Sequence, residues 1–454
     1  MRKLLFAFTA VIFAISLAAC EGGGTQDDSV EIVFWHAWGE VNQSFVRDMF
    51  DSFTAANADL DVRLSQTGQG GWTDLRDTMI FAISSGNTPT MAVGYPDHFA
   101  NYINGNALRP LNEFINHPEY GVDIEDFIGG FMAENMQFGD LIYSMPLAKS
   151  TEMVVFNKTV FDHHGIFPMD MNRAVTWDDL EQWQEIIVGS GPMQCEFLFN
   201  ADSATNFFIN SSRQFGAGYT NVEGEILVDN PETVAMLEYF QARFADNTLV
   251  LPIEWDQQYG SNNFIAGDVC MTQGSTAGTR FNIPTEETGK FGRFEIGIIP
   301  VVQNTFCPLD PLADPDTIDP RCSAMQQGPN IAIMADATDE EALAAWKFIR
   351  HMTDEENTRY FAQNTGYIPV RNSAFESVEY QEFLNTTDPD QLPFAMSARA
   401  AYNQVLFYRF DPAFLGEVTS SRARDEVGLA LEALFTGDGV QDVMDQLRNR
   451  LRLD

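Results

Sequence analysis

The sequence predicts an α/β fold. Segments typical of strands alternate with segments typical of helices between residues 30 and 93, and the alternation recurs further along the chain. Such alternation is characteristic of sheets flanked by helices. Hydrophobic residues make up 45% of the 454 residues, so the chain can bury a large core, and its length suffices for two or three domains. No short-period repeat is present, which excludes a solenoid.

The first alternating stretch contains three strands and two helices. In order, we expect a strand at 30–35, a helix at 41–56, a strand at 62–65, a helix at 72–85 and a strand at 91–93. Phe45, Met49 and Phe53 recur at helical spacing, and Leu75 and Met79 do the same in the second helix. Each helix therefore has one apolar face that can cover a sheet.

The second stretch is marked by helix-capping residues. Thr176 is a natural N-cap, and Asp178 and Asp179 follow in the first turn, where the helix dipole favours negative charge. Asn230 followed by Pro231 starts another helix by the same logic. The further expected elements are strands at 153–156, 295–300 and 331–334, a helix at 340–352 and helices from about residue 420.

The charge balance of the chain is strongly acidic. It contains 65 Asp and Glu against 26 Lys and Arg, a formal net charge of −39. A nucleic-acid partner requires a basic footprint, and anionic lipid would repel this protein, so both are excluded as charge-driven partners. The acidic residues are scattered, which is typical of a solvated surface. A saline habitat, in which salt screens the repulsion, is one hypothesis for this composition.

The N-terminus has the features of a lipoprotein signal. Arg2 and Lys3 precede an apolar run from Leu4 to Leu17, and small residues then lead into Cys20. The run of about 14 residues is shorter than the roughly 20 that span a bilayer. We expect residues 1–19 to be removed, Cys20 to be acylated, and residues 20–29 to form a flexible tether outside the cytoplasm. An ordinary signal peptide with an incidental cysteine is the alternative.

Four further cysteines remain, and disulfides are permitted outside the cytoplasm. Cys307 and Cys322 bracket a loop rich in Pro and Asp, and a bridge between them would contribute about 3 kcal/mol in the chain-entropy account. Cys195 and Cys270 could pair or remain as two buried thiols. No CxxC pair occurs, so zinc and thioredoxin-like chemistry have no support.

No arrangement of residues indicates catalysis. The six histidines show no HExxH or HxH spacing, and neither a GxSxG nor a GxxxxGK[ST] motif is present. Carboxylate pairs are uninformative in so acidic a chain. We therefore expect no enzymatic activity, no cofactor and no metal site. A secreted glycoside hydrolase or phosphodiesterase remains a remote alternative.

Aromatic residues gather in loops that follow the predicted strands. Trp35 and Trp38 follow the first strand, Trp72 opens the second helix, and Tyr95 follows the third strand. Ligands of open α/β sheets sit at the carboxyl ends of strands, and aromatic rings there suit stacking on a sugar or covering a polyol. For any single tryptophan, core packing is the alternative.

Eight short motifs occur in an order that resembles a known family. They are 34–36 (Phe-Trp-His), 84–89 (Ser-Ser-Gly-Asn-Thr-Pro), 142–151 (Ile-Tyr-Ser-Met-Pro-Leu-Ala-Lys-Ser-Thr), 155–158 (Val-Phe-Asn-Lys), 176–180 (Thr-Trp-Asp-Asp-Leu), 264–272 (Phe-Ile-Ala-Gly-Asp-Val-Cys-Met-Thr), 345–349 (Ala-Trp-Lys-Phe-Ile) and 365–371 (Thr-Gly-Tyr-Ile-Pro-Val-Arg). Together they resemble the extracellular solute-binding proteins (family 1) of carbohydrate ABC importers, and most of all the glycerol-3-phosphate-binding branch.

The resemblance implies a two-lobed periplasmic-binding-protein fold of type II. Each lobe would be a mixed β-sheet flanked by helices, with a hinge between the lobes and the ligand in the cleft. We expect residues 30–148 and 300–350 in the first lobe, and 149–299 and 351–454 in the second. The implied partners are permease subunits of an ABC importer, and we expect a monomer that is lipid-anchored to the cell membrane.

Position by position, the resemblance places ligand residues of the branch at Trp72, Ser150, Ser275, Gly328, Tyr367 and Arg424. Arg424 would pair with phosphate through its planar fork, and the serines and tyrosine would supply neutral donors. Pro96 departs from the branch, which has a polyol-binding glutamate there, and the adjacent Asp97 could substitute for it. For Arg424, a weak surface salt bridge is the alternative reading.

The resulting prediction is a binding protein that performs no covalent chemistry. Its ligand would be glycerol 3-phosphate, a glycerophosphodiester or a related small polyol or sugar ligand. A neutral mono- or oligosaccharide is the alternative within the family, motivated by Pro96 and by the aromatic loops. A sensor subunit of a signalling receptor would share the same fold.

Overall fold

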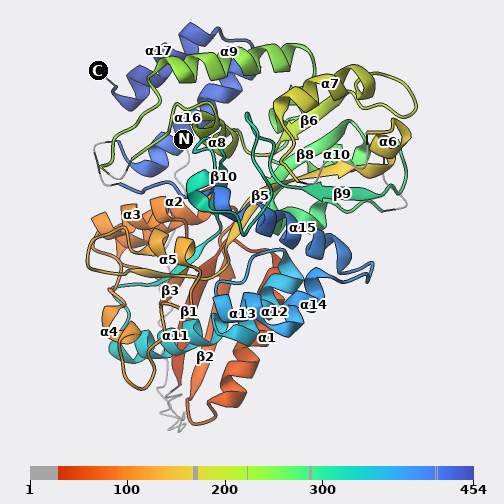
Figure 1. Cartoon of the computed structure of the whole chain (residues 1–454). Helices are drawn as coiled ribbons and strands as arrows, with labels where there is room; N and C mark the ends of the chain where they lie inside the picture. The colour runs from red at the N-terminus through yellow and green to blue at the C-terminus, as the bar shows by residue number, and fades with distance from the viewer. Residues whose placement is uncertain are drawn as a thin grey trace, which may run out of the picture.

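The computed structural model describes residues 29–166, 172–221, 223–285, 289–414, 416 and 418–453. The predicted signal segment 1–19, Cys20 and the tether up to residue 28 lie outside these described residues. Two sheets, each covered by helices, form two lobes, with β1, β2 and α11 in the lower part of Figure 1 and β6, β8 and α9 in the upper part. Within the described ranges, no helix combines the length and apolar character needed to cross a membrane.

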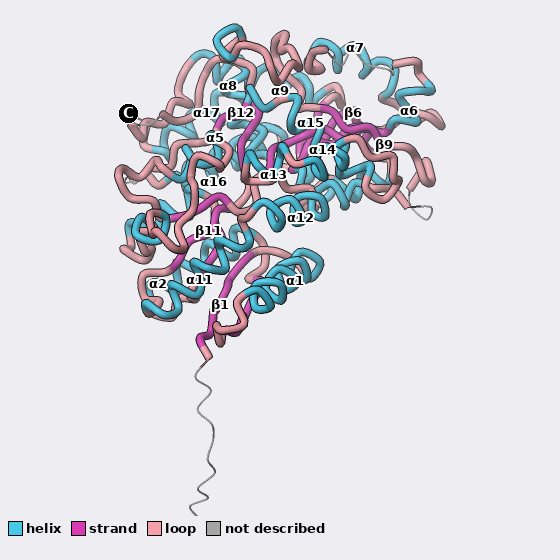
Figure 2. Tube along the Cα trace, turned by 60° about the horizontal axis from the view of Figure 1, so that its bottom comes forward, coloured by secondary structure: helices cyan, strands magenta, loops and turns pink. Residues whose placement is uncertain are grey.

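The first lobe contains a five-stranded mixed sheet in the order β2-β1-β3-β11-β4. Strand β1 runs parallel to both β2 and β3, whereas β11 is antiparallel to both β3 and β4. The strands are β1 (Val30–His36), β2 (Val62–Gly68), β3 (Met91–Gly94), β4 (Ser144–Pro146) and β11 (Asn330–Ile333). The helices of this lobe are α1 (Glu40–Ala56), α2 (Trp72–Ser85), α3 (Pro96–Asn104), α4 (Asn112–Ile115), α5 (Gly129–Asn135), α11 (Asp339–Met352) and α12 (Glu355–Thr365), and Figure 2 shows α1, α2 and α11 grouped around β1.

The second lobe contains a seven-stranded mixed sheet built around β5. Its strands are β5 (Ser150–Asn157), β6 (Phe197–Ala201), β7 (Leu249–Val250), β8 (Val269–Ser275), β9 (Ile296–Ile299), β10 (Ala324–Gln327) and β12 (Tyr408–Arg409). Its helices are α6 (Lys158–His163), α7 (Trp177–Ile187), α8 (Ala204–Gln214), α9 (Pro231–Ala245), α10 (Ser261–Ala266), α15 (Leu392–Asn403), α16 (Ser420–Phe435) and α17 (Val440–Leu451). Two short helices, α13 (Asn372–Glu376) and α14 (Val378–Leu384), and the 3-10 turns η1 (Pro252–Trp255), η2 (Thr276–Asn282), η3 (Pro315–Thr317) and η4 (Val405–Phe407) complete the described elements.

The predicted α/β fold with two mixed sheets is confirmed, and the local signals account for it. The helix α2 spans the predicted residues 72–85, and its buried side chains Leu75 and Met79 are those that share the apolar face. Thr176 caps α7 by accepting a hydrogen bond from the Asp179 amide, as its position indicates. Asn230 caps α9 in the same way.

The structure differs from the sequence-based division of the lobes in two places. Residues 300–327 pack with the second lobe: β10 pairs with β5, and the segment around Cys307 packs against Ala174 and Phe407. Conversely, α12 and Tyr367 belong to the hydrophobic core of the first lobe. The chain therefore crosses between the lobes near residues 328–329 instead of 300, and it remains with the first lobe beyond residue 350.

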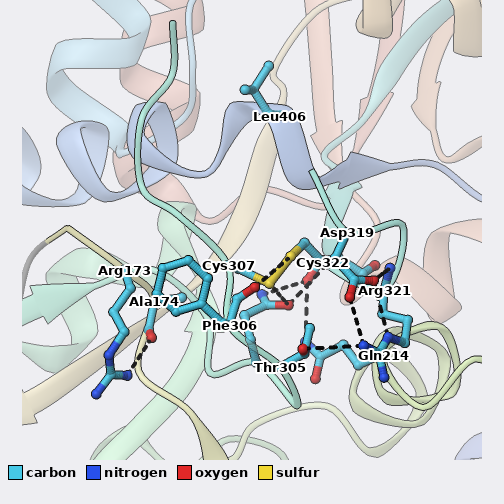
Figure 3. The surroundings of a disulfide bond; sticks show 12 residues. Arg173, Ala174, Gln214, Thr305, Phe306, Cys307, Asp319, Arg321, Cys322 and Leu406 are labelled. Atoms are coloured by element: carbon cyan, nitrogen blue, oxygen red, sulfur yellow. Dashed lines mark hydrogen bonds and ion pairs between the residues drawn. A yellow bond between two sulfur atoms is a disulfide. The ribbon is translucent and has the colours of Figure 1, made fainter. Parts of the chain in front are cut away.

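Two disulfides cross-link the second lobe. Cys195 and Cys270 join the starts of β6 and β8, which are neighbouring parallel strands, across a sequence separation of 75 residues. Cys307 and Cys322 are fully buried and close the shorter loop, with Asp319 and Arg321 beside them in Figure 3. Both bridges restrict the unfolded chain more than the folded one.

Removing either disulfide should lower the thermal stability. The chain-entropy account gives about 3 kcal/mol for the Cys307–Cys322 loop and about 4.5 kcal/mol for the longer Cys195–Cys270 loop. We expect the double variant Cys195→Ser/Cys270→Ser to unfold at a lower temperature than Cys307→Ser/Cys322→Ser in differential scanning calorimetry. Unchanged transition temperatures in both variants would contradict this account.

Candidate ligand-binding cleft

A cleft of about 960 Å³ lies between the two lobes and is lined by residues of both. From the first lobe it receives the loops that follow β1 and β3 and the start of α2. From the second lobe it receives β5, the segment after β6, the end of β8 and the first turns of α16. The carboxyl ends of β1, β3, β6 and β8 thus meet at the cleft, where α/β folds bind ligands, and β5 contributes its amino end.

Most of the sequence-predicted site residues lie at this cleft. The lining residues among them are Trp38, Trp72, Tyr95, Asp97, Ser150, Ser275, Tyr367 and Arg424. Gly328 and Trp35 are not among the lining residues. Side chains separated by up to 386 positions, from Trp38 to Arg424, are therefore brought to one cavity.

Gly328 has a structural reason of its own to be glycine. Its φ of +95° is left-handed, and a Cβ there would lie 2.2 Å from the Ala148 carbonyl oxygen. Its carbonyl accepts a 2.8 Å hydrogen bond from Lys149 Nζ. The position therefore serves the close contact between two crossing segments, and Trp35 packs, half-buried, against the first-lobe core.

Aromatic side chains form one wall of the cleft. The rings of Trp72 and Tyr95 lie 4.9 Å apart between centroids. Trp38 Nε1 donates a 3.0 Å hydrogen bond to the Tyr367 hydroxyl, and Tyr367 also stacks on Phe361. Burial raises the pKa of Tyr367 to about 12, so the hydroxyl stays protonated and can donate a hydrogen bond to a ligand.

Arg424 is fixed in place by the packing of two helices. Gly428 allows α16 to approach α8 closely, because a Cβ there would lie 2.3 Å from Thr205 Oγ1. The guanidinium of Arg424 then donates hydrogen bonds to Asp411 Oδ2 (2.7 Å) and to Asn206 Oδ1 (2.6 Å). Burial alone would lower the pKa of Arg424. Its charged neighbours, Asp411 above all, outweigh burial and raise the pKa, so the group is a permanent cation.

Asp97 connects the two lobes instead of standing free in the cleft. Its Oδ2 accepts a 2.8 Å hydrogen bond from the hydroxyl of Ser421, at the start of α16. Nearby, Arg76 of the first lobe forms an ion pair of 3.1 Å with Asp425 of α16. Burial alone would raise the pKa of Asp97, but His98 and Arg424 outweigh burial and lower it, so the carboxylate stays ionised.

Two carboxyl groups of the second lobe, the buried Glu152 and the partly buried Asp202, were not singled out from the sequence. Burial raises the pKa of Glu152 to about 7 and that of Asp202 to about 6. Glu152 accepts hydrogen bonds from Gln273 Nε2 (2.8 Å) and Asn206 Nδ2 (3.2 Å). In a chain with 65 acidic residues no local signal separates these two, and only the fold shows that they share the cleft.

The cleft can therefore bind a small polar molecule without chemical change. It offers the guanidinium groups of Arg424 and Arg76, several carboxyl groups, neutral hydroxyl and amide groups, and aromatic faces. Among the residues that the structure describes, no group of three or more His, Cys, Asp or Glu side chains is arranged to hold a metal ion.

Comparisons with known proteins agree with this architecture. Residues 48–387 match the profile of a family described as bacterial extracellular solute-binding protein. The sn-glycerol-3-phosphate-binding periplasmic protein UgpB of Escherichia coli K12 is 25% identical over 389 residues, which cover 83% of this chain and 82% of that protein.

Solved structures show the same fold. UgpB of Mycobacterium tuberculosis in complex with glycerophosphocholine superposes with a TM-score of 0.73 at 21% identity, covering 94% of this chain and 98% of that chain. An ABC substrate-binding protein of Listeria monocytogenes in complex with cycloalternan gives a TM-score of 0.71 at 17% identity, covering 94% and 100% of the two chains.

Glu152→Gln should stabilise the protein at alkaline pH. Because the pKa of Glu152 is raised in the folded state, its proton favours folding at low pH, and this contribution is lost as the pH rises through about 7. Glutamine mimics the protonated form at every pH. We expect the variant to exceed the wild type in free energy of unfolding by roughly 1 to 3 kcal/mol at pH 8, and by much less at pH 5, in urea titrations. A difference independent of pH would show that Glu152 is not a buried titrating group.

Proposed function

This chain belongs to the family of bacterial extracellular solute-binding proteins, and we propose that it captures a glycerol phosphate ester in its interlobe cleft. The ester would be glycerol 3-phosphate or a glycerophosphodiester, delivered to the permease of an ABC importer. Solute-binding proteins of ABC importers bind small sugar or polyol ligands and work with permeases. The observation that carries the proposal is the permanent cation Arg424, held at the cleft by α8 and α16.

An arginine in this position suits a phosphate ester. The planar guanidinium can donate two parallel hydrogen bonds to phosphate oxygens, and a partly buried site strengthens them. The glycerol part would lie against Trp72 and Tyr95, with the Tyr367 hydroxyl as a donor. Since these groups come from both lobes, a ligand that contacts all of them would favour the closed arrangement.

The size of the cleft favours a diester over a bare monoester. A cleft of about 960 Å³ leaves room for a substituent beyond the phosphate. The structural similarity to a UgpB solved with glycerophosphocholine supports the same choice. No covalent chemistry is part of this role.

A neutral oligosaccharide is the second candidate. Arg424 already pairs with Asp411, so the cation is partly neutralised before any ligand binds. The aromatic wall of Trp38, Trp72 and Tyr95 would also suit stacking on sugar rings. The similarity to the cycloalternan-binding protein supports this candidate.

We further propose that the protein is exported and tethered by lipid at Cys20, as a monomer. The tether would hold the two lobes near the membrane that carries the permease. Its acidic body would not adhere to anionic lipid by charge, so the lipid would supply the attachment.

Changing Arg424→Ala should remove binding of phosphate esters. Isothermal titration of the wild type with glycerol 3-phosphate and glycerophosphocholine should release heat, and the variant should lose affinity roughly 30-fold or more because a charge-assisted pair is lost. Arg422→Ala is the matched control, since Arg422 lies on the same helix with its side chain 46% exposed.

The same titrations separate the two candidates. Binding of maltotriose with no response to either phosphate ester would reject the phosphate-ester proposal in favour of the oligosaccharide. Turnover of any of these ligands, followed by chromatography, would contradict a binding role.

The anchor at Cys20 can be tested in cells. A Cys20→Ala variant should move from the membrane fraction to the soluble fraction in immunoblots, because the proposed attachment to the bilayer is the lipid on Cys20. Cys307→Ser is a control for the loss of a cysteine. Retention of Cys20→Ala in a carbonate-washed membrane fraction would contradict the lipid anchor.

A further inference from the structure

We propose that Tyr219 and Gln327 complete an anion subsite around Arg424. The inference rests on the proposed binding of a phosphate ester and identifies two residues that would hold the phosphate. Both residues line the cleft. Neither is among the residues expected from the sequence.

The orientation of the Gln327 amide follows from a chain of hydrogen bonds. A guanidinium can only donate, so Asn206 must turn its Oδ1 towards Arg424. The Nδ2 of Asn206 then donates to Gln327 Oε1 (3.2 Å) and to Glu152 Oε1 (3.2 Å). This leaves Gln327 Nε2 as a buried donor that has no hydrogen-bond partner among the described residues.

Tyr219 presents a second donor without a partner. Its side chain is 2% exposed, and its hydroxyl oxygen makes no hydrogen bond within the part of the chain that the structure describes. Burial raises the pKa of Tyr219 well above its usual value, and the negative charge of Asp411 is the second cause of this rise. The hydroxyl therefore stays protonated and can donate a hydrogen bond.

Three acceptors of this region are already engaged, whereas two of its donors, the Tyr219 hydroxyl and Gln327 Nε2, are not engaged by any described residue. Asn206 Oδ1 accepts from Arg424, Gln327 Oε1 accepts from Asn206, and Asp411 accepts from both Arg213 and Arg424. Arg213 and Arg424 share Asp411 as a partner, and Asp97 is a further negative charge near Arg424. A phosphate accepts hydrogen bonds at several oxygens and carries negative charge, so it matches unpaired donors better than a sugar hydroxyl does.

Leaving such donors unpaired carries a cost that a ligand would relieve. A buried polar group without a partner destabilises a protein, so unpaired donors tend to be kept where a ligand completes them. Replacement of Tyr219 by phenylalanine should therefore leave stability unchanged or raise it, while lowering affinity. A purely structural tyrosine would show no such separation.

The test compares Tyr219→Phe and Gln327→Glu with a matched control, Tyr102→Phe. Tyr102 is also buried with an unpartnered hydroxyl among the described residues, but it does not line the cleft. In titrations with glycerol 3-phosphate we expect Tyr219→Phe to lose roughly tenfold in affinity and Gln327→Glu more, because it replaces a donor by a negative charge. Tyr102→Phe should bind as the wild type does.

The outcomes separate this inference from the function on which it rests. If the wild type binds glycerol 3-phosphate and both cleft variants stay within twofold of it, the inference is overturned and the proposed function stands. If the wild type binds no phosphate ester, both are overturned. Thermal melting of each variant shows that it is folded, and a loss of affinity in the Tyr219→Phe variant without loss of stability would support the subsite.

Discussion

A buried ion pair fixes the crossing of the chain between the two lobes. Lys149 is fully buried and Glu134 is 2% exposed, and Lys149 Nζ lies 2.8 Å from Glu134 Oε2. The same ammonium also donates to the Gly328 carbonyl. Removing one partner of such a pair leaves an uncompensated charge and costs about 3 to 5 kcal/mol. Because β5 and β11 lead away from this point into different sheets, the ion pair lies where the chain passes between the lobes.

The helix α16 lines the cleft from the second lobe and also contacts the first lobe. It packs on α8 in the second lobe, yet Ser421 and Asp425 reach Asp97 and Arg76 of the first lobe. Arg424 lies between these two contacts on the same helix. A protein with a net charge of −39 repels an anion at long range, so a fixed local cation has to overcome this repulsion.

Much of the fold follows from local signals, and the site follows from them only in part. The strands and helices up to residue 94 match their predicted positions because each has a clear period and a clear capping or turn residue. Strand β10 was not expected, since its Gln326 and Gln327 are polar, and their hydrogen-bond partners Gly130 and Asn206 lie far away in the sequence. The roles of Glu152 and Asn206 likewise arise from neighbours that only the tertiary structure supplies.

The position of Asp97 changes where a polyol could bind. The sequence suggests Asp97 as the substitute for a hydroxyl-binding glutamate, but its carboxylate is engaged by Ser421 and lowered in pKa by its cationic neighbours. The pKa of Glu152 is about 7 and that of Asp202 is about 6, so near these pH values each carboxyl group is partly protonated. Such a group can donate a hydrogen bond as well as accept one. Hydroxyl groups need both kinds of partner, whereas phosphate needs donors alone. The cleft thus separates two chemistries, with donors around Arg424 and groups of mixed character beside Glu152, and a molecule with a phosphate at one end and hydroxyls at the other would satisfy both.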